Sequence, residues 1–144
     1  MVELVDLADF DFPVRLPQRA TAEMCRFAAV VGQADGFVVV TPEYNRSFPA
    51  SLKQAIDFAY DEWHAKPVGF VSYGHGSRGH HAIAALRVVF TELHTVTVRD
   101  EVAIDLMEAR PGPATESAAA MLLDELVWWG EALRRARADK PYVS

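Results

Sequence analysis

Gly36-Phe37-Val38-Val39-Val40-Thr41 is a continuous run of apolar and β-branched residues that stops at Pro42. A run of this kind is typical of a strand buried on both faces of a parallel sheet. After a short polar loop, Pro49 suits the first turn of a helix, because the N–H that proline lacks would be unpaired there. The apolar stripe of that helix is Leu52, Ala55, Ile56, Ala59 and Trp63. The segment therefore predicts a strand, a loop and a helix, in that order.

The same order recurs on both sides of this unit. Upstream, the apolar positions within 2–7 predict a short strand, and Thr21 is a candidate N-cap for a helix with Met24, Phe27 and Val31 on one face. Downstream, residues 68–73 predict a strand and 74–79 a tight loop, followed by a helix with the apolar stripe Ile83, Leu86, Phe90 and Leu93.

The C-terminal part of the chain predicts one more strand and one long helix. Residues 95–98 and 102–104 are β-rich pieces interrupted by Arg99-Asp100-Glu101, which indicates a single bent or broken strand. Thr115 is expected to cap the final helix. Strands that alternate with helices form parallel βαβ units with helices on both sheet faces, so we expect one α/β domain over residues 1–144.

The composition excludes several classes of function. The 144 residues carry a formal net charge of -6, which argues against general affinity for nucleic acid or anionic membranes. The single cysteine, Cys25, excludes an internal disulfide framework and a multi-cysteine metal site. No stretch approaches the length of a membrane span, and Met1-Val2-Glu3 opens with no basic stretch followed by an apolar run, so the expected location is the cytoplasm.

Two loops are the first places to look for chemistry, because open α/β sheets bind ligands beyond the carboxyl ends of their strands. The first loop contains Pro42, Glu43, Tyr44 and Asn45, and the second is the glycine-rich segment 74–79. An aromatic face beside backbone N–H groups suits a planar heterocycle with polar edges. The alternative is that the first loop is only a turn in which Glu43 or Asn45 caps a helix.

Two rival interpretations concern the second loop. Gly74-His75-Gly76-Ser77-Arg78-Gly79 matches the dinucleotide pattern G-x-G-x-x-G, but that pattern belongs at the first βα turn and needs an acid after the next strand, whereas Glu92 lies in a predicted helix. His75, His80 and His81 suggest a metal site. Adjacent histidines on a helix point about 100° apart and lack a carboxylate at ligand spacing, so no metal is predicted.

Longer motifs resemble a known family. The residues Thr41-Pro42-Glu43-Tyr44-Asn45, Ser47-Phe48-Pro49 and Leu52-Lys53-Gln54-Ala55-Ile56-Asp57 resemble the TPEYN…P…LKNAID signature of NADPH-dependent FMN reductases. The resemblance continues through the glycine loop to Ala84-Ala85-Leu86-Arg87 and spans roughly residues 2–104. It implies a flavodoxin-like three-layer sandwich, noncovalent FMN, and NADPH or NADH as the reductant of the flavin, which then reduces a small-molecule acceptor.

The resemblance also implies the site residues. Pro42, Glu43, Tyr44 and Asn45 would line one side of the isoalloxazine, and Gly74, Gly76, Ser77 and Gly79 would lie along its pyrimidine edge. The cofactor would perform the hydride chemistry, so no catalytic side chain is expected. A homodimer or homotetramer is implied as well.

The resemblance departs from the family pattern at the N-terminus. Family members open with a strand and a loop of the GSxRxxS kind that holds the FMN phosphate, and the segment resembling 2–13 is normally their second strand. We therefore expect a truncated fold without the first strand and helix, an incomplete phosphate site, and a strand at 2–7 that either pairs with 36–41 or leaves an edge exposed. The alternative function is a cofactor-free remnant that acts as a binding or assembly subunit, with Trp128 or Trp129 as an interface anchor.

Overall fold

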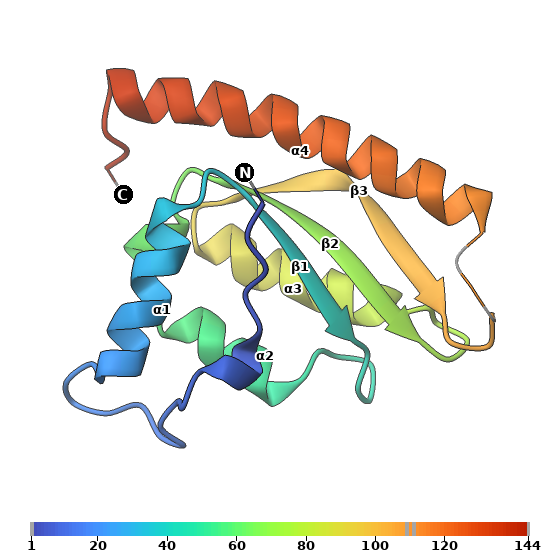
Figure 1. Cartoon of the computed structure of the whole chain (residues 1–144), viewed down its shortest axis with the longest axis horizontal. Coiled ribbons are helices and arrows are strands. Elements are labelled where there is room, and N and C mark those ends of the chain that lie inside the picture. The colour runs from blue at the N-terminus through green and yellow to red at the C-terminus, as the bar shows by residue number, and fades with distance from the viewer. Residues whose placement is uncertain (1, 109, 111, 144) are drawn as a thin grey trace.

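The computed structural model describes residues 2–108, 110 and 112–143 and contains the predicted parallel sheet (Figure 1). Its strands, in the order β1-β2-β3, are β1 (Phe37–Pro42), β2 (Pro67–Gly74) and β3 (Val96–Asp105). The helices are α1 (Ala22–Gln33), α2 (Ala50–Asp57), α3 (His80–Glu92) and α4 (Pro113–Asp139). Both strand pairs are parallel, which confirms the βαβ prediction.

Helices cover both faces of the sheet, as the alternation of elements predicts. Side chains of α1, α2 and α3 pack together on one face, while α4 packs alone on the other, above the sheet in Figure 1. Phe70 and Phe90 are fully buried in the larger core. Trp63 joins them: its ring lies 4.6 Å from that of Phe37 and 5.4 Å from that of Phe90, and its Nε1 donates to the Ile56 carbonyl.

The predicted interruption of the last strand is a register shift within β3. Val68 of β2 pairs with Thr97, whereas Phe70 pairs with Glu101, so β3 carries extra residues opposite Gly69. The carboxylate of Glu125 on α4 accepts from two of their backbone N–H groups, those of Arg99 at 3.0 Å and Asp100 at 3.1 Å. Because these donors have partners, β3 continues as one strand.

The predicted strand at residues 2–7 is wrong. Residues 2–6 are exposed and unpaired, with Val2 98% exposed, and a 3-10 turn spans Leu7–Asp9. Alternating apolar residues form a strand only beside a partner strand. Here the segment is instead held by Phe10 and Phe12, whose rings meet Phe27 edge-on at 5.4 and 5.5 Å.

The first strand is therefore an edge strand. Within the described residues, nothing pairs with the side of β1 that faces away from β2. Val38 and Val40, on the sheet face that carries α4, are 39% and 61% exposed, because α4 lies over β2 and β3 and leaves them uncovered. Of the two outcomes that the sequence left open, pairing with 2–7 or an exposed edge, the structure shows the exposed edge. The prediction that this strand is buried on both faces is wrong for the face of Val38 and Val40.

Helix boundaries agree with the sequence in one case and shift in two. Thr21 caps α1, with its hydroxyl accepting from Met24 N at 3.3 Å. The helix predicted to run to Trp63 ends at Asp57, and Trp63 reaches the core from a separate 3-10 turn, Asp61–Trp63. The last helix begins at Pro113 rather than at Thr115.

Candidate functional site

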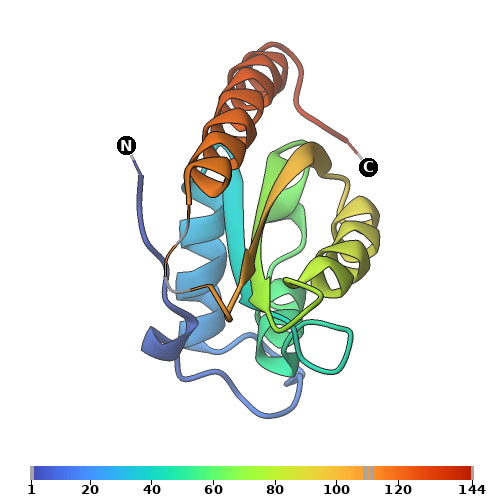
Figure 2. The same cartoon turned by 90° about the vertical axis from the view of Figure 1, so that its right-hand side faces the viewer.

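The two loops singled out from the sequence lie side by side at the carboxyl edge of the sheet, as Figures 1 and 2 show. Pro42 is opposite Tyr73 in the strand register, and Glu43 N continues the ladder by donating to the Tyr73 carbonyl at 2.9 Å. The segment after β3 joins them, because Leu106 N donates to the Gly74 carbonyl at 3.1 Å. Three strand ends thus converge on one edge.

The first loop is a tight two-residue turn. Tyr44 and Ser47 exchange both backbone hydrogen bonds, at 2.8 and 3.0 Å, and the central residues Asn45 and Arg46 have φ of 50° and 66°. Positive φ at both central positions is the hairpin turn that favours Asn followed by Gly. The turn holds Tyr44 on the surface, where its side chain is 61% exposed.

The second loop folds back on the strand from which it emerges. Gly79 has φ of 90°, and a Cβ placed on it would lie 2.4 Å from the Ser72 side chain. The Ser72 hydroxyl donates to the Arg78 carbonyl at 3.0 Å. Gly76, with φ of 67°, has nothing within 4 Å of the corresponding position, so a ligand can approach its backbone closely.

Glu43 connects the two loops. Its Oε2 accepts from the backbone N–H of His81, in the first turn of α3, at 3.1 Å. A Cβ on Gly74 would lie 3.4 Å from the Cβ of Glu43, so the two chains are in close contact there. The sequence offered, as an alternative, a turn in which Glu43 or Asn45 caps the helix that follows; α2 has no side-chain cap, and Glu43 instead accepts from the distant α3.

This contact argues against the dinucleotide interpretation. A dinucleotide needs its pyrophosphate at the N-terminus of the helix after the glycine loop. In this structure that terminus holds the carboxylate of Glu43, whose negative charge repels a phosphate. Arg78 does not offset it, because its guanidinium pairs with Glu108 at 3.2 Å and Asp105 at 3.8 Å.

The predicted site residues therefore form two groups. Glu43, Gly74 and Gly79 meet in packed contact, whereas Tyr44, Asn45 and Gly76 face outward. This arrangement places an exposed aromatic ring beside open backbone, the surroundings that the sequence predicts for a planar heterocycle. At the N-terminus of α3, by contrast, it leaves no place for the flavin phosphate.

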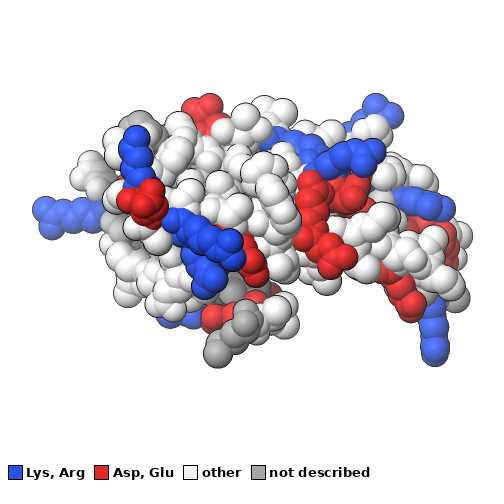
Figure 3. Space-filling model, turned by 90° about the horizontal axis from the view of Figure 1, so that it is seen from above, with Lys and Arg blue, Asp and Glu red and all other residues white. Residues whose placement is uncertain are grey.

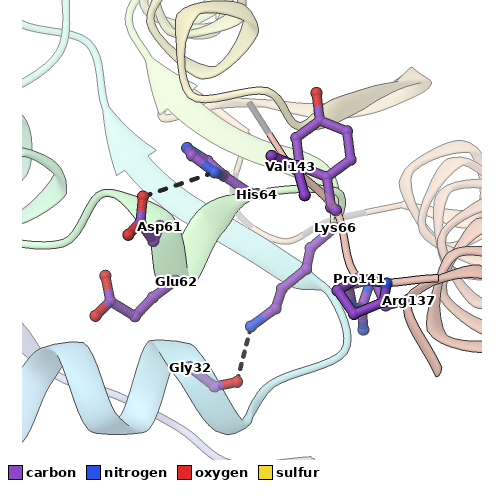
Figure 4. Close-up of a pocket in the computed structure, with 9 residues that line it drawn as sticks. Gly32, Asp61, Glu62, His64, Lys66, Arg137, Pro141 and Val143 are labelled. Carbon is purple, nitrogen blue, oxygen red and sulfur yellow. Dashed lines mark hydrogen bonds and ion pairs between the residues drawn. The ribbon is translucent and has the colours of Figure 1, made fainter.

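Two open pockets lie outside this pair of loops. One, of about 520 Å³, lies beside the first loop at Ser47 and Phe48 and extends along α2. The other, of about 650 Å³, lies at the opposite end of the strands, around Lys66 (Figure 4). Neither was predicted from the sequence.

Lys66 is a buried cation that sequence reasoning missed. Its Nζ donates to the carbonyls of Val31 and Gly32 at the end of α1, both at 2.9 Å, and the residue is only 6% exposed (Figure 4). Burial, and then the nearby Arg137, lower the pKa of Lys66 to about 8. Its hydrogen-bond partners lie more than 30 positions earlier in the sequence, so no local sequence pattern predicts these contacts.

Other classes of site receive no support within the described parts of the chain. No group of three His, Cys, Asp or Glu side chains is placed to hold a metal ion, and His80 instead contacts Glu101, Nδ1 to Oε1, at 2.7 Å. No described helix is long and apolar enough to cross a membrane.

Comparison with known proteins identifies the family. The sequence profile of the NADPH-dependent FMN reductase family matches residues 1–109. An NAD(P)H-dependent FMN reductase of Schizosaccharomyces pombe is 57% identical over 47 residues, 32% of this chain and 24% of that protein. An NADPH azoreductase of Bacillus sp. is 27% identical over 127 residues, 85% of this chain and 71% of that protein. The chain thus matches only about a quarter of the length of the Schizosaccharomyces pombe relative.

The fold comparison points the same way. The flavoenzyme NAD(P)H:(acceptor) oxidoreductase of Paracoccus denitrificans superposes with a TM-score of 0.69 at 22% identity, covering 87% of this chain and 76% of that one. The fold is accordingly flavodoxin-like, with a parallel sheet between helical layers. On the match over residues 1–109, this chain belongs to the NADPH-dependent FMN reductase family.

Proposed function

We propose that this chain is an oxidoreductase that uses FMN to pass electrons from NADPH or NADH to a small-molecule acceptor of the quinone or azo type. The observation that supports it best is the junction of the Tyr44 turn with the glycine loop through Glu43. Family membership and the name of the azoreductase relative support the reaction class. When bound, FMN supplies the hydride and electron transfer, and the protein positions its ring.

The proposed cofactor-binding residues keep the roles that the resemblance implies. Tyr44 offers its exposed ring as a stacking surface for the isoalloxazine, flanked by Pro42 and Asn45. Gly76 leaves the backbone open to the pyrimidine edge. The other members of this set are Glu43, Gly74, Ser77 and Gly79. No side chain is assigned as acid or base.

The proposal predicts that the protein discriminates weakly between FMN and riboflavin. The ring is met by both loops, while the N-terminus of α3 holds Glu43 instead of a phosphate. Dissociation constants for the two flavins are expected to agree within about threefold, a difference below about 0.7 kcal/mol. Flavin fluorescence titration measures both constants, and NADPH oxidation with added FMN and a quinone measures turnover.

Two results would contradict this proposal. Binding of FMN far tighter than riboflavin would show a phosphate site that the proposal does not contain. Failure to bind either flavin, together with no oxidation of NADPH, would favour the cofactor-free binding or assembly subunit.

We further propose that residues 1–144 form one domain and that the protein is cytoplasmic. We also propose that it forms a homodimer through β1. A single cysteine suits a reducing compartment. Leu123 and Val127 of α4 lie on the helix side that approaches Asp35, just before β1, and are 49% and 58% exposed. Leu123, Val127, Val38 and Val40 together form an apolar surface beside the unpaired edge of β1. Figure 3 shows uncharged areas between the charged groups on the α4 side of the molecule.

Sizing chromatography with light scattering tests the dimer. Val40→Lys is expected to yield monomer, because a charge at the unpaired edge opposes strand pairing. The control, Val88→Lys on α3, changes a valine that is 73% exposed and away from β1, and it should leave the dimer intact. A wild-type protein that elutes only as monomer rules the dimer out.

A further inference from the structure

Glu43 makes contacts that a residue facing a ligand would not make. Its backbone N–H donates to Tyr73 at the end of β2, and its carboxylate accepts from His81, which lies 38 positions later in the chain. Its Cβ adjoins the place of Gly74. All three contacts join the first loop to the segments on either side of the second loop, the end of β2 and the start of α3.

The carboxylate supplies a cap that α3 otherwise lacks. The N-cap residue of α3 is Gly79, which has no side chain to accept from the first-turn N–H groups. Unpaired N–H groups and the helix dipole both favour a negative group at this position. A side-chain cap contributes about 1 kcal/mol, and here it also ties the end of the glycine loop to the Pro42–Asn45 loop.

We propose that Glu43 is a positioning residue, which sets the spacing between the Tyr44 turn and the glycine loop and does not itself bind the flavin. The inference rests on the proposed function and reassigns one residue within it. Because the carboxylate faces α3, the surface left for the ring is formed by its neighbours on the two loops. The hydrogen bond to His81 then acts with the two backbone contacts of Glu43 to hold Tyr44 and Gly76 at the separation that a flat ring needs.

Three substitutions of Glu43 distinguish the effect of its hydrogen-bond acceptor from the effect of its negative charge. Glu43→Gln keeps an oxygen that accepts from His81 N but removes the charge. Glu43→Ala removes both, and Glu43→Asp keeps the charge but shortens the reach by one methylene. The matched control is Asp57→Asn, which changes an exposed carboxylate that pairs with Lys53 at the far end of α2.

The first measurement needs no flavin. Hydrogen exchange of the His81 amide and the first turn of α3 is expected to be about five- to tenfold faster in Glu43→Ala, which corresponds to losing a cap of about 1 kcal/mol. Asp57→Asn should exchange at the wild-type rate, and Glu43→Gln, which keeps the acceptor but loses the charge that the helix dipole favours, should fall between the wild type and Glu43→Ala. Unchanged exchange in Glu43→Ala would show that the carboxylate does not hold α3 and would overturn the proposal. If Glu43→Ala does not fold, Glu43→Asp replaces it, with the same expected direction.

The second measurement uses flavin titration and the visible spectrum of bound FMN. Glu43→Ala is expected to raise the dissociation constants of FMN and riboflavin equally, by roughly tenfold, and to shift the flavin absorption band, whereas Glu43→Gln restores wild-type affinity. Faster exchange with unchanged affinity and spectrum would make Glu43 a structural cap only and overturn the positioning role. A wild-type protein that binds neither flavin defeats the proposed function and this role together, whereas wild-type binding that Glu43→Ala leaves intact defeats this role alone.

Discussion

Gly79→Ala is expected to lower the free energy of unfolding by about 3–5 kcal/mol, measured by urea denaturation. An alanine at φ of 90° is strained because this region is accessible mainly to glycine. The added methyl group would also lie 2.4 Å from the Ser72 side chain and 2.9 Å from Tyr73 N, which forces β2 and the loop apart. The two costs add because one concerns the backbone of residue 79 and the other its neighbours.

A second glycine in the same loop is the control. Gly76 also has positive φ, but a Cβ there would meet nothing within 4 Å. Gly76→Ala should therefore cost only the backbone strain, about 1 kcal/mol. Equal losses in the two variants would show that the loop relaxes freely and that the packing against Ser72 is not tight.

The buried Lys66 is expected to make the protein more stable at alkaline pH. Its pKa is lowered to about 8 in the folded state from 10.5, so between these values the unfolded chain binds more protons. Stability therefore rises with pH across this window and is independent of this group below it. A shift of this size corresponds to at most about 3 kcal/mol, gained between pH 8 and 10.5.

Urea denaturation of Lys66→Met at several pH values isolates this contribution. The variant has no amine to titrate, so its free energy of unfolding should lack the rise that the wild type shows above pH 8. Lys53→Met is the control, because Lys53 is exposed and pairs with Asp57 on the surface of α2. Parallel pH curves for wild type and Lys66→Met would contradict the assignment.

The sheet and most helices could be predicted because their signals are local. The run from Gly36 to Thr41 consists of glycine, apolar and β-branched residues, and the cap at Thr21 lies directly before its helix. Even the break in β3 is visible as three charged residues between β-rich pieces. Each of these features depends on residues within a few positions of one another.

The errors and omissions involve partners that are distant in sequence. Residues 2–6 have strand composition, but composition does not supply a neighbouring strand, and the chain there is anchored by Phe10 and Phe12 instead. The cap that Glu43 gives to α3 and the bonds from Lys66 to the end of α1 span more than 30 positions. Sequence patterns located the two loops of the candidate site, but not the contact that joins them.

The tight turn that follows Glu43 has one more consequence. Its shape is fixed by two main-chain hydrogen bonds and two left-handed residues, none of which involves the phenol of Tyr44. The backbone conformation of the turn is therefore expected to stay the same when Tyr44 is replaced by another aromatic residue. A series of aromatic side chains with increasing electron density can therefore be placed at position 44. Across that series, only the electron density of the ring changes.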